Sequence, residues 1–160
     1  MSTPPLHPDC APLVGLLGTW RGRGSGEYPT IESFEYVEEV TFAHVGKPFL
    51  AYGQKTRDAG DDRPLHTEAG YWRPVASDRL EIVLSHPTGV AEILEGSIVT
   101  GSLTVFDLHT TSVSLTSTAK DVTELHRHFE LEGDVLRYRV AMAAVGEPLT
   151  HHLEAVLHRQ

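Results

Sequence analysis

The sequence has a single cysteine, Cys10, among its 160 residues. One thiol excludes an intrachain disulfide framework, a cysteine-based zinc or iron–sulfur cluster and the C-x-x-C-H motif of covalent heme attachment. Basic residues are also few: 13 Lys and Arg stand against 22 Asp and Glu, and the formal net charge is −9. Because this charge repels phosphate backbones and anionic lipid headgroups, we expect neither nucleic acid nor membrane as a partner.

Long hydrophobic runs are absent as well. No stretch approaches the 18 apolar residues of a membrane-spanning helix, and Met1–Pro12 contains four prolines instead of the apolar core of a signal peptide. We therefore expect a soluble, cytoplasmic protein. A length of 160 residues predicts one domain over 1–160, with residues 1–10 flexible.

No apolar stripe of helical period extends over three turns after Trp20. Short runs rich in β-branched and aromatic residues alternate with turn residues instead, which predicts strands. These runs are Thr19–Arg23, Phe34–His44, Phe49–Thr56, His66–Arg73, Leu80–Ser85, Val90–Leu94, Ser97–Val99, Ser102–Leu108, Ser112–Thr116, Val122–Glu132, Val135–Ala143 and Thr150–His158.

The pattern favours an all-β fold: an antiparallel up-and-down β-barrel of about ten strands, similar to lipocalins and fatty-acid-binding proteins. A barrel removes exposed sheet edges, and one of this size can enclose a single small ligand. The one helical candidate, Ala11–Leu17, is expected to form a short N-terminal cap over one end of the barrel.

Several motifs are spread along the chain in a fixed order. They are Gly18-x-Trp20-x-Gly22-x-Gly24, Tyr28-Pro29-Thr30-Ile31, Phe34-x-Tyr36-x-Glu38, Phe42-x-His44-x-Gly46-x-Pro48, Glu68-x-Gly70-Tyr71, His86-Pro87-x-Gly89 and His152-Leu153-x-Ala155-x-Leu157. Together they resemble the nitrobindin family from Leu16 to Leu157. The resemblance implies a β-barrel with heme b, held non-covalently at one open end by one histidine of the last strand. It also implies binding of nitric oxide and isomerisation of peroxynitrite to nitrate.

Two adjacent histidines, His151 and His152, compete for the role of heme ligand. Strand alternation groups His151 with Leu153, Ala155 and Leu157, and so favours His151 as the inward residue. The family motif places the ligand directly before Leu153, at His152. Because strands bend at the mouth of a barrel and alternation fails there, we follow the motif and predict His152 as both iron ligand and catalytic residue.

Two further residues are candidates for contacts with heme. Thr30 belongs to the Tyr28–Ile31 motif, where its hydroxyl could reach heme or a propionate, and Lys120 could neutralise a propionate at the mouth. The alternatives are a turn residue for Thr30 and a solvent-exposed charge for Lys120. His44 and His86 are interpreted as structural residues of turns, and His66 is left undecided.

The resemblance thus implies a peroxynitrite isomerase, and we expect its ferric heme to act as a Lewis acid on peroxynitrite. Two alternatives stay open: a lipocalin-like carrier of a small apolar molecule, and a heme-based nitric oxide sensor or carrier without turnover. The oligomeric state is also open, with a homodimer as one arrangement.

Overall fold

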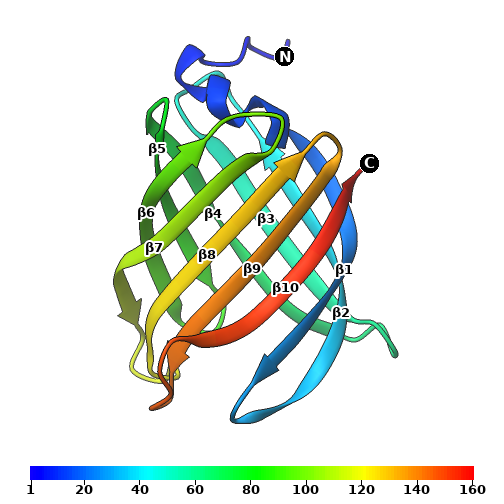
Figure 1. Cartoon of the computed structure of the whole chain (residues 1–160), viewed down its shortest axis with the longest axis vertical. Coiled ribbons are helices and arrows are strands. Elements are labelled where there is room, and N and C mark those ends of the chain that lie inside the picture. The colour runs from blue at the N-terminus through cyan, green and yellow to red at the C-terminus, as the bar shows by residue number, and fades with distance from the viewer.

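The computed structural model describes residues 1–160 and shows a closed antiparallel β-barrel of ten strands (Figure 1). The elements are η1 (Pro8–Leu16), β1 (Gly18–Tyr28), β2 (Ile31–Ala43), β3 (Leu50–Asp58), β4 (Pro64–Ala76), β5 (Arg79–His86), β6 (Val90–Val99), β7 (Thr104–Leu115), β8 (Val122–Glu132), β9 (Val135–Ala144) and β10 (Thr150–Arg159). Each strand pairs with its neighbour in the chain, and β1 pairs with β10. Closure leaves no sheet edge free, which confirms the predicted fold class.

Two pairs of predicted runs are continuous strands in the structure. The first pair forms β6, because Gly96 lies within the strand and is not a turn residue. A side chain at Gly96 would collide with the carbonyl oxygen of Asp107, so glycine is required here by the close approach of β7. The second pair forms β7. Ser112 pairs with Ile93 and Thr110 pairs with Leu94, so Thr111 is an extra residue at a β-bulge, where the sequence pattern indicated a break between two strands.

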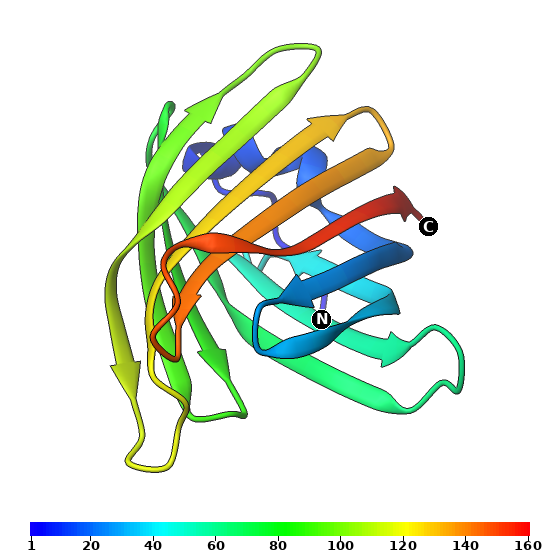
Figure 2. The ribbon, with the colours of Figure 1, turned by 60° about the horizontal axis from the view of Figure 1, so that its bottom comes forward.

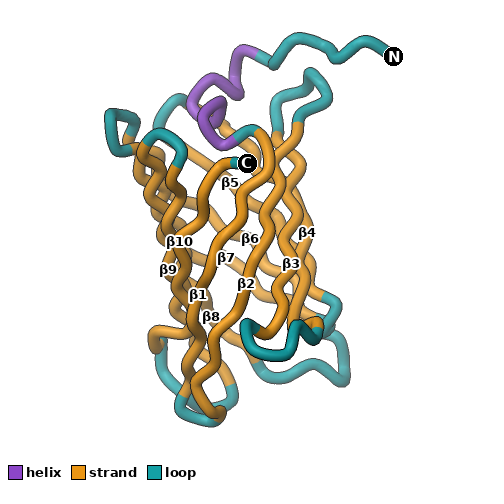
Figure 3. Tube along the Cα trace, turned by 90° about the vertical axis from the view of Figure 1, so that its right-hand side faces the viewer, coloured by secondary structure: helices purple, strands orange, loops and turns teal.

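The helix η1 lies across one end of the barrel (Figure 3), and large apolar side chains are buried beneath it. Trp20 is fully buried there, and its indole Nε1 donates to the carbonyl oxygen of Leu16 at 2.7 Å. The guanidinium of Arg159 lies 4.3 Å from the centroid of the Trp20 ring. Trp20, η1 and the C-terminal strand therefore hold this end shut.

The cap differs from its prediction in type and bounds. It is a 3₁₀ helix over Pro8–Leu16, whereas the sequence favoured Ala11–Leu17. The helix begins early because Pro8 suits a first helical turn and the imidazole of His7 accepts a hydrogen bond from the backbone of Asp9. Since η1 takes up Pro8–Cys10 and buries Cys10, flexibility stays a prediction for the residues before Pro8.

The opposite end of the barrel carries the β1–β2, β3–β4, β5–β6, β7–β8 and β9–β10 connections (Figure 2). It has no helix across it, so this end stays open. No helix in the structure combines the length and the hydropathy needed to cross a bilayer.

Candidate functional site

A cavity of about 1260 Å³ occupies the open half of the barrel. Apolar side chains line it at the strand ends that form the mouth: Ile31, Phe34, Leu65, Val122, Met142 and Leu153. Deeper in the barrel the lining changes to tyrosines and ionisable side chains, including Tyr36, Glu38, Glu68, Glu92 and Arg127. The cavity thus has a polar floor and a mouth where these apolar side chains lie beside charged ones such as Glu27, Glu32 and Arg63.

His152 lies at a β-bulge near the start of β10. His151 pairs with Ala141 and Leu153 pairs with Val140, so that His152 has no partner in the register. The extra residue reverses the alternation between His151 and Leu153. This break is why strand periodicity alone groups His151 with the buried residues Ala155 and Leu157.

The ring of His152 is held in one orientation. Its Nδ1 lies 2.9 Å from the backbone carbonyl oxygen of Glu27, and the ring of Tyr28 packs edge-on against it with centroids 5.3 Å apart. Because a carbonyl oxygen only accepts hydrogen bonds, Nδ1 carries the proton and Nε2 keeps its lone pair. Burial lowers the pKa of His152, so the imidazole is neutral at pH 7.

His151 has no comparable anchor. Its side chain is 38% exposed, and its Nε2 lies 3.9 Å from the exposed carboxylate of Glu154. Both histidines border the cavity, but only His152 has a ring nitrogen fixed by the backbone. Of the two, His152 is therefore the residue prepared to bind a metal at Nε2.

A hydrogen-bonded network of charged side chains forms the cavity floor, and sequence reasoning missed it. Arg127 donates from Nε to Glu92 at 2.7 Å, from Nη1 to Glu68 at 2.9 Å and from Nη2 to both carboxylates at 3.1 Å. Tyr52 donates to Glu68 at 2.7 Å. The signal was present in the sequence: Arg127 shares the inward face of β8 with Leu125 and other buried apolar residues.

Arg127 determines the protonation of both carboxylates. Burial raises the pKa of Glu92, but the charge of Arg127 and a hydrogen bond from His86 outweigh it and hold that pKa at about 2. Burial likewise raises the pKa of Glu68, and Arg127 brings it below its ordinary value. Both carboxylates are therefore ionised around a single guanidinium at neutral pH.

His66 and His86 join this floor. His86 is the last residue of β5 and is nearly buried, and its Nε2 lies 2.7 Å from Glu92. His66 reaches it from β4, with Nε2 3.0 Å from the Nδ1 of His86. The turn role expected for His86 is thus replaced by a place in the cavity wall, and His66 is assigned to the same wall. His44 accepts a hydrogen bond from Gly46 in the β2–β3 connection, as interpreted from the sequence.

Glu38 is a third buried carboxyl group in the cavity. It accepts a hydrogen bond from the hydroxyl of Tyr138, while its Oε1 has no partner. Burial raises the pKa of Glu38 to about 8. Unlike Glu68 and Glu92, this group is mostly protonated at pH 7, so it adds no full charge to the cavity.

The comparisons with known proteins agree with this architecture. The model of the THAP4-like, heme-binding β-barrel domain matches residues 9–159. The chain belongs to this family of heme-binding β-barrels. The match confirms the resemblance drawn from the Gly18–Leu157 motifs.

Relatives of the heme-binding family cover nearly the whole chain. The peroxynitrite isomerase 2 of Mycobacterium avium is 62% identical over 97% of both chains, and the peroxynitrite isomerase of Nocardia farcinica is 56% identical over 96% of this chain and 92% of its own. The crystal structure of Rv2717c from M. tuberculosis superposes with a TM-score of 0.95 at 52% identity, and covers 98% of this chain and 99% of that one.

The cavity of this heme-binding barrel fits its expected occupant. Its volume is above the range of about 300–1,000 Å³ common for small-molecule sites. Its mouth offers apolar walls for a porphyrin and, in His152, a neutral imidazole with a free Nε2. The donor set and the walls therefore suit heme, with His152 as the side chain able to hold its iron.

The two other predicted heme contacts lie outside this cavity. Thr30 is exposed in the β1–β2 turn, and Lys120 is exposed in the β7–β8 connection. Both connections border the open end, but neither side chain belongs to the cavity lining. Two other residues of the Tyr28–Ile31 motif do reach the site: Tyr28 packs against the ring of His152, and Ile31 lines the cavity.

Proposed function

We propose that this protein binds heme b non-covalently through Nε2 of His152, binds nitric oxide and isomerises peroxynitrite to nitrate in the cytoplasm. The observation that carries the proposal is the hydrogen bond from Nδ1 of His152 to the carbonyl of Glu27, which leaves Nε2 free at the mouth of the cavity. The names of the M. avium and N. farcinica relatives support the reaction. Cys10 is buried under the closed end, which argues for non-covalent heme.

The residues of the chain have separate tasks in this function. When bound, ferric heme would supply a Lewis acid for a small oxyanion or diatomic ligand. The Glu27 carbonyl keeps the proton of His152 on Nδ1, and Tyr28 keeps the ring from rotating. Val122, Met142 and Leu153 exclude water from the apolar walls. Glu38 keeps its proton at neutral pH and so spares the cavity a further negative charge.

Stopped-flow decay of peroxynitrite tests the proposal. We expect the heme-loaded protein to accelerate the decay in proportion to its concentration and to raise the yield of nitrate over nitrite. The protein freed of both heme and divalent metal should do neither, since the Lewis acid of this reaction is the heme iron. Free heme in buffer, at the same concentration, is the reference.

Two results would contradict the proposal, and each points to one alternative. A stoichiometric Soret band with peroxynitrite decay no faster than that with free heme would indicate a nitric oxide sensor or carrier without turnover. A heme titration indistinguishable from heme in buffer would indicate a carrier of a different apolar molecule.

A further inference from the structure

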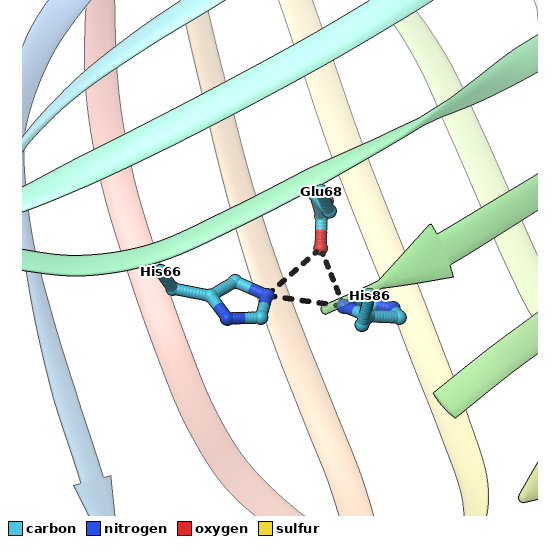
Figure 4. Close-up of side chains that lie close together, drawn as sticks. All are labelled: His66, Glu68 and His86. Atoms are coloured by element: carbon cyan, nitrogen blue, oxygen red, sulfur yellow. Dashed lines mark hydrogen bonds and ion pairs between the residues drawn. The ribbon is translucent and has the colours of Figure 1, made fainter. Parts of the chain in front are cut away.

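Three potential metal ligands converge on one point of the cavity wall. His66 and Glu68 are two residues apart on β4 and therefore face the same side of the sheet. His86 reaches them from the end of β5 (Figure 4). Nε2 of His66 lies 3.0 Å from Nδ1 of His86 and 3.9 Å from Oε2 of Glu68. Nδ1 of His86 lies 3.4 Å from the same Oε2.

The triangle has the dimensions of a metal site. Ligand atoms bound at about 2.0–2.1 Å to a tetrahedral ion stand roughly 3.3–3.4 Å apart. The three observed separations, 3.0, 3.4 and 3.9 Å, bracket that value. A small cation can thus bond all three atoms with only slight movement of the side chains.

The lone pairs are also arranged for a cation. Nε2 of His86 lies 2.7 Å from the carboxylate of Glu92 and donates its proton there, so Nδ1 presents a lone pair. That lone pair lies 3.4 Å from the carboxylate oxygen of Glu68, which is also an acceptor. A histidine whose second nitrogen donates to a carboxylate is the usual outer arrangement of protein metal ligands.

His66 completes the set. In the absence of metal its Nε2 shares a hydrogen bond of 3.0 Å with Nδ1 of His86. The side chain of His66 is 32% exposed, so its Nδ1 can carry the proton instead and be solvated. This tautomer turns the lone pair of Nε2 towards the other two ligands.

The charge balance of the floor favours a cation as well. Glu68 and Glu92 carry two negative charges, and Arg127 supplies one positive charge. The two carboxylates thus outnumber the one guanidinium in this buried cluster, and a bound cation would compensate their charge further. The groups facing this cluster from neighbouring strands, Tyr52 and Glu38, add no positive charge.

We propose that His66, Glu68 and His86 bind one divalent transition-metal ion, with a fourth coordination position open to the cavity. Two imidazoles and one carboxylate suit Zn²⁺, Co²⁺ or Fe²⁺, and three protein ligands with one open position are the pattern of reactive metal sites rather than structural ones. The site is separate from His152 and does not depend on the binding of heme.

Metal titration of the full-length, heme-free protein after chelator treatment tests this site. We expect Co²⁺ to give intense visible d–d bands that saturate at one equivalent, and Zn²⁺ to abolish them. Zn²⁺ should also raise the Tm of the wild type, because it binds the folded state alone. His66→Ala is the main variant, since the partly exposed ring can be removed without opening the core, and we expect Zn²⁺ affinity to fall at least 100-fold.

Controls separate this site from other histidines. His126→Ala removes a ligand from the exposed cluster of Asp107, His109 and His126, and His152→Ala removes the proposed heme ligand. Both variants should keep the saturating Co²⁺ spectrum. The proposal is overturned if His66→Ala binds Zn²⁺ as the wild type does, if the spectrum is lost with His126→Ala or His152→Ala instead, or if micromolar Zn²⁺ does not bind.

Discussion

Replacing Arg127 with methionine is expected to lower the free energy of unfolding by about 3–5 kcal/mol at pH 7. The variant keeps an apolar stem of similar length but leaves Glu68 and Glu92 as two buried carboxylates without a cation. Removing one partner of a buried ion pair costs more than the pair contributes, because the desolvated charge stays behind. Urea unfolding at pH 7 measures the loss.

The pH dependence of stability between pH 7 and pH 5 should become steeper in this variant, because in the wild type only Glu38, with a pKa of about 8, makes stability rise as the pH falls over this range. In the wild type the pKa of Glu92 is about 2, below its ordinary value, so stability is lost as the pH falls from about 4.5 towards 2. Without Arg127 the same burial raises both carboxyl pKa values above the unfolded ones. The folded state then binds more protons than the unfolded state, and stability rises as the pH is lowered from 7 towards 5.

Arg139→Met is the matched control. Arg139 is an exposed arginine on β9, the strand next to Arg127, and its loss should change stability by no more than about 0.5 kcal/mol. Equal stability of Arg127→Met and Arg139→Met at pH 7 would contradict the account of the cavity floor. So would an Arg127→Met variant that loses stability between pH 7 and pH 5.

The second large effect is expected at the mouth. His152→Ala should weaken heme binding at least 100-fold and shift the Soret band of the ferric protein, because it removes the oriented Nε2. His151→Ala should leave both the affinity and the spectrum within twofold of the wild type, since His151 has no backbone anchor. Heme titration followed by absorption measures both variants under the same conditions.

Neither variant should disturb the fold. Both histidines lie at the open end and outside the hydrophobic core, so an intact barrel should be visible by circular dichroism. If His151→Ala loses heme and His152→Ala keeps it, the strand alternation was the correct guide and the motif was not. Loss of heme affinity in both variants would show that both histidines are needed to bind heme and that the assignment to His152 alone is wrong.

The architecture was predictable because it depends on local signals. Runs of β-branched and aromatic residues between turn residues indicate strands whatever their partners are, and the bounds predicted for Val122–Glu132 match β8. Local signals failed where pairing with another strand decides. The predicted runs were interrupted at Gly96, although glycine is needed there because the carbonyl oxygen of Asp107 in the next strand comes close.

The candidate site was predictable only in part, for the same reason. The motif singled out His152, but the bulge that orients it depends on pairing with β9. Alternation along β8 could have placed Arg127 inside the barrel, yet its partner Glu68 is 59 residues away and is chosen by the closed topology. Thr30, chosen for its place in the Tyr28–Ile31 motif, and Lys120, chosen as a charge at the mouth, stay predictions, and neither side chain belongs to the cavity lining.

A crystal structure of the heme-loaded protein would test the central claim most directly. We predict heme at the open end, with its iron bonded to Nε2 of His152 and Nδ1 of the same ring still donating to the carbonyl of Glu27. Iron bonded to His151, or heme placed away from the cavity mouth, would contradict the account.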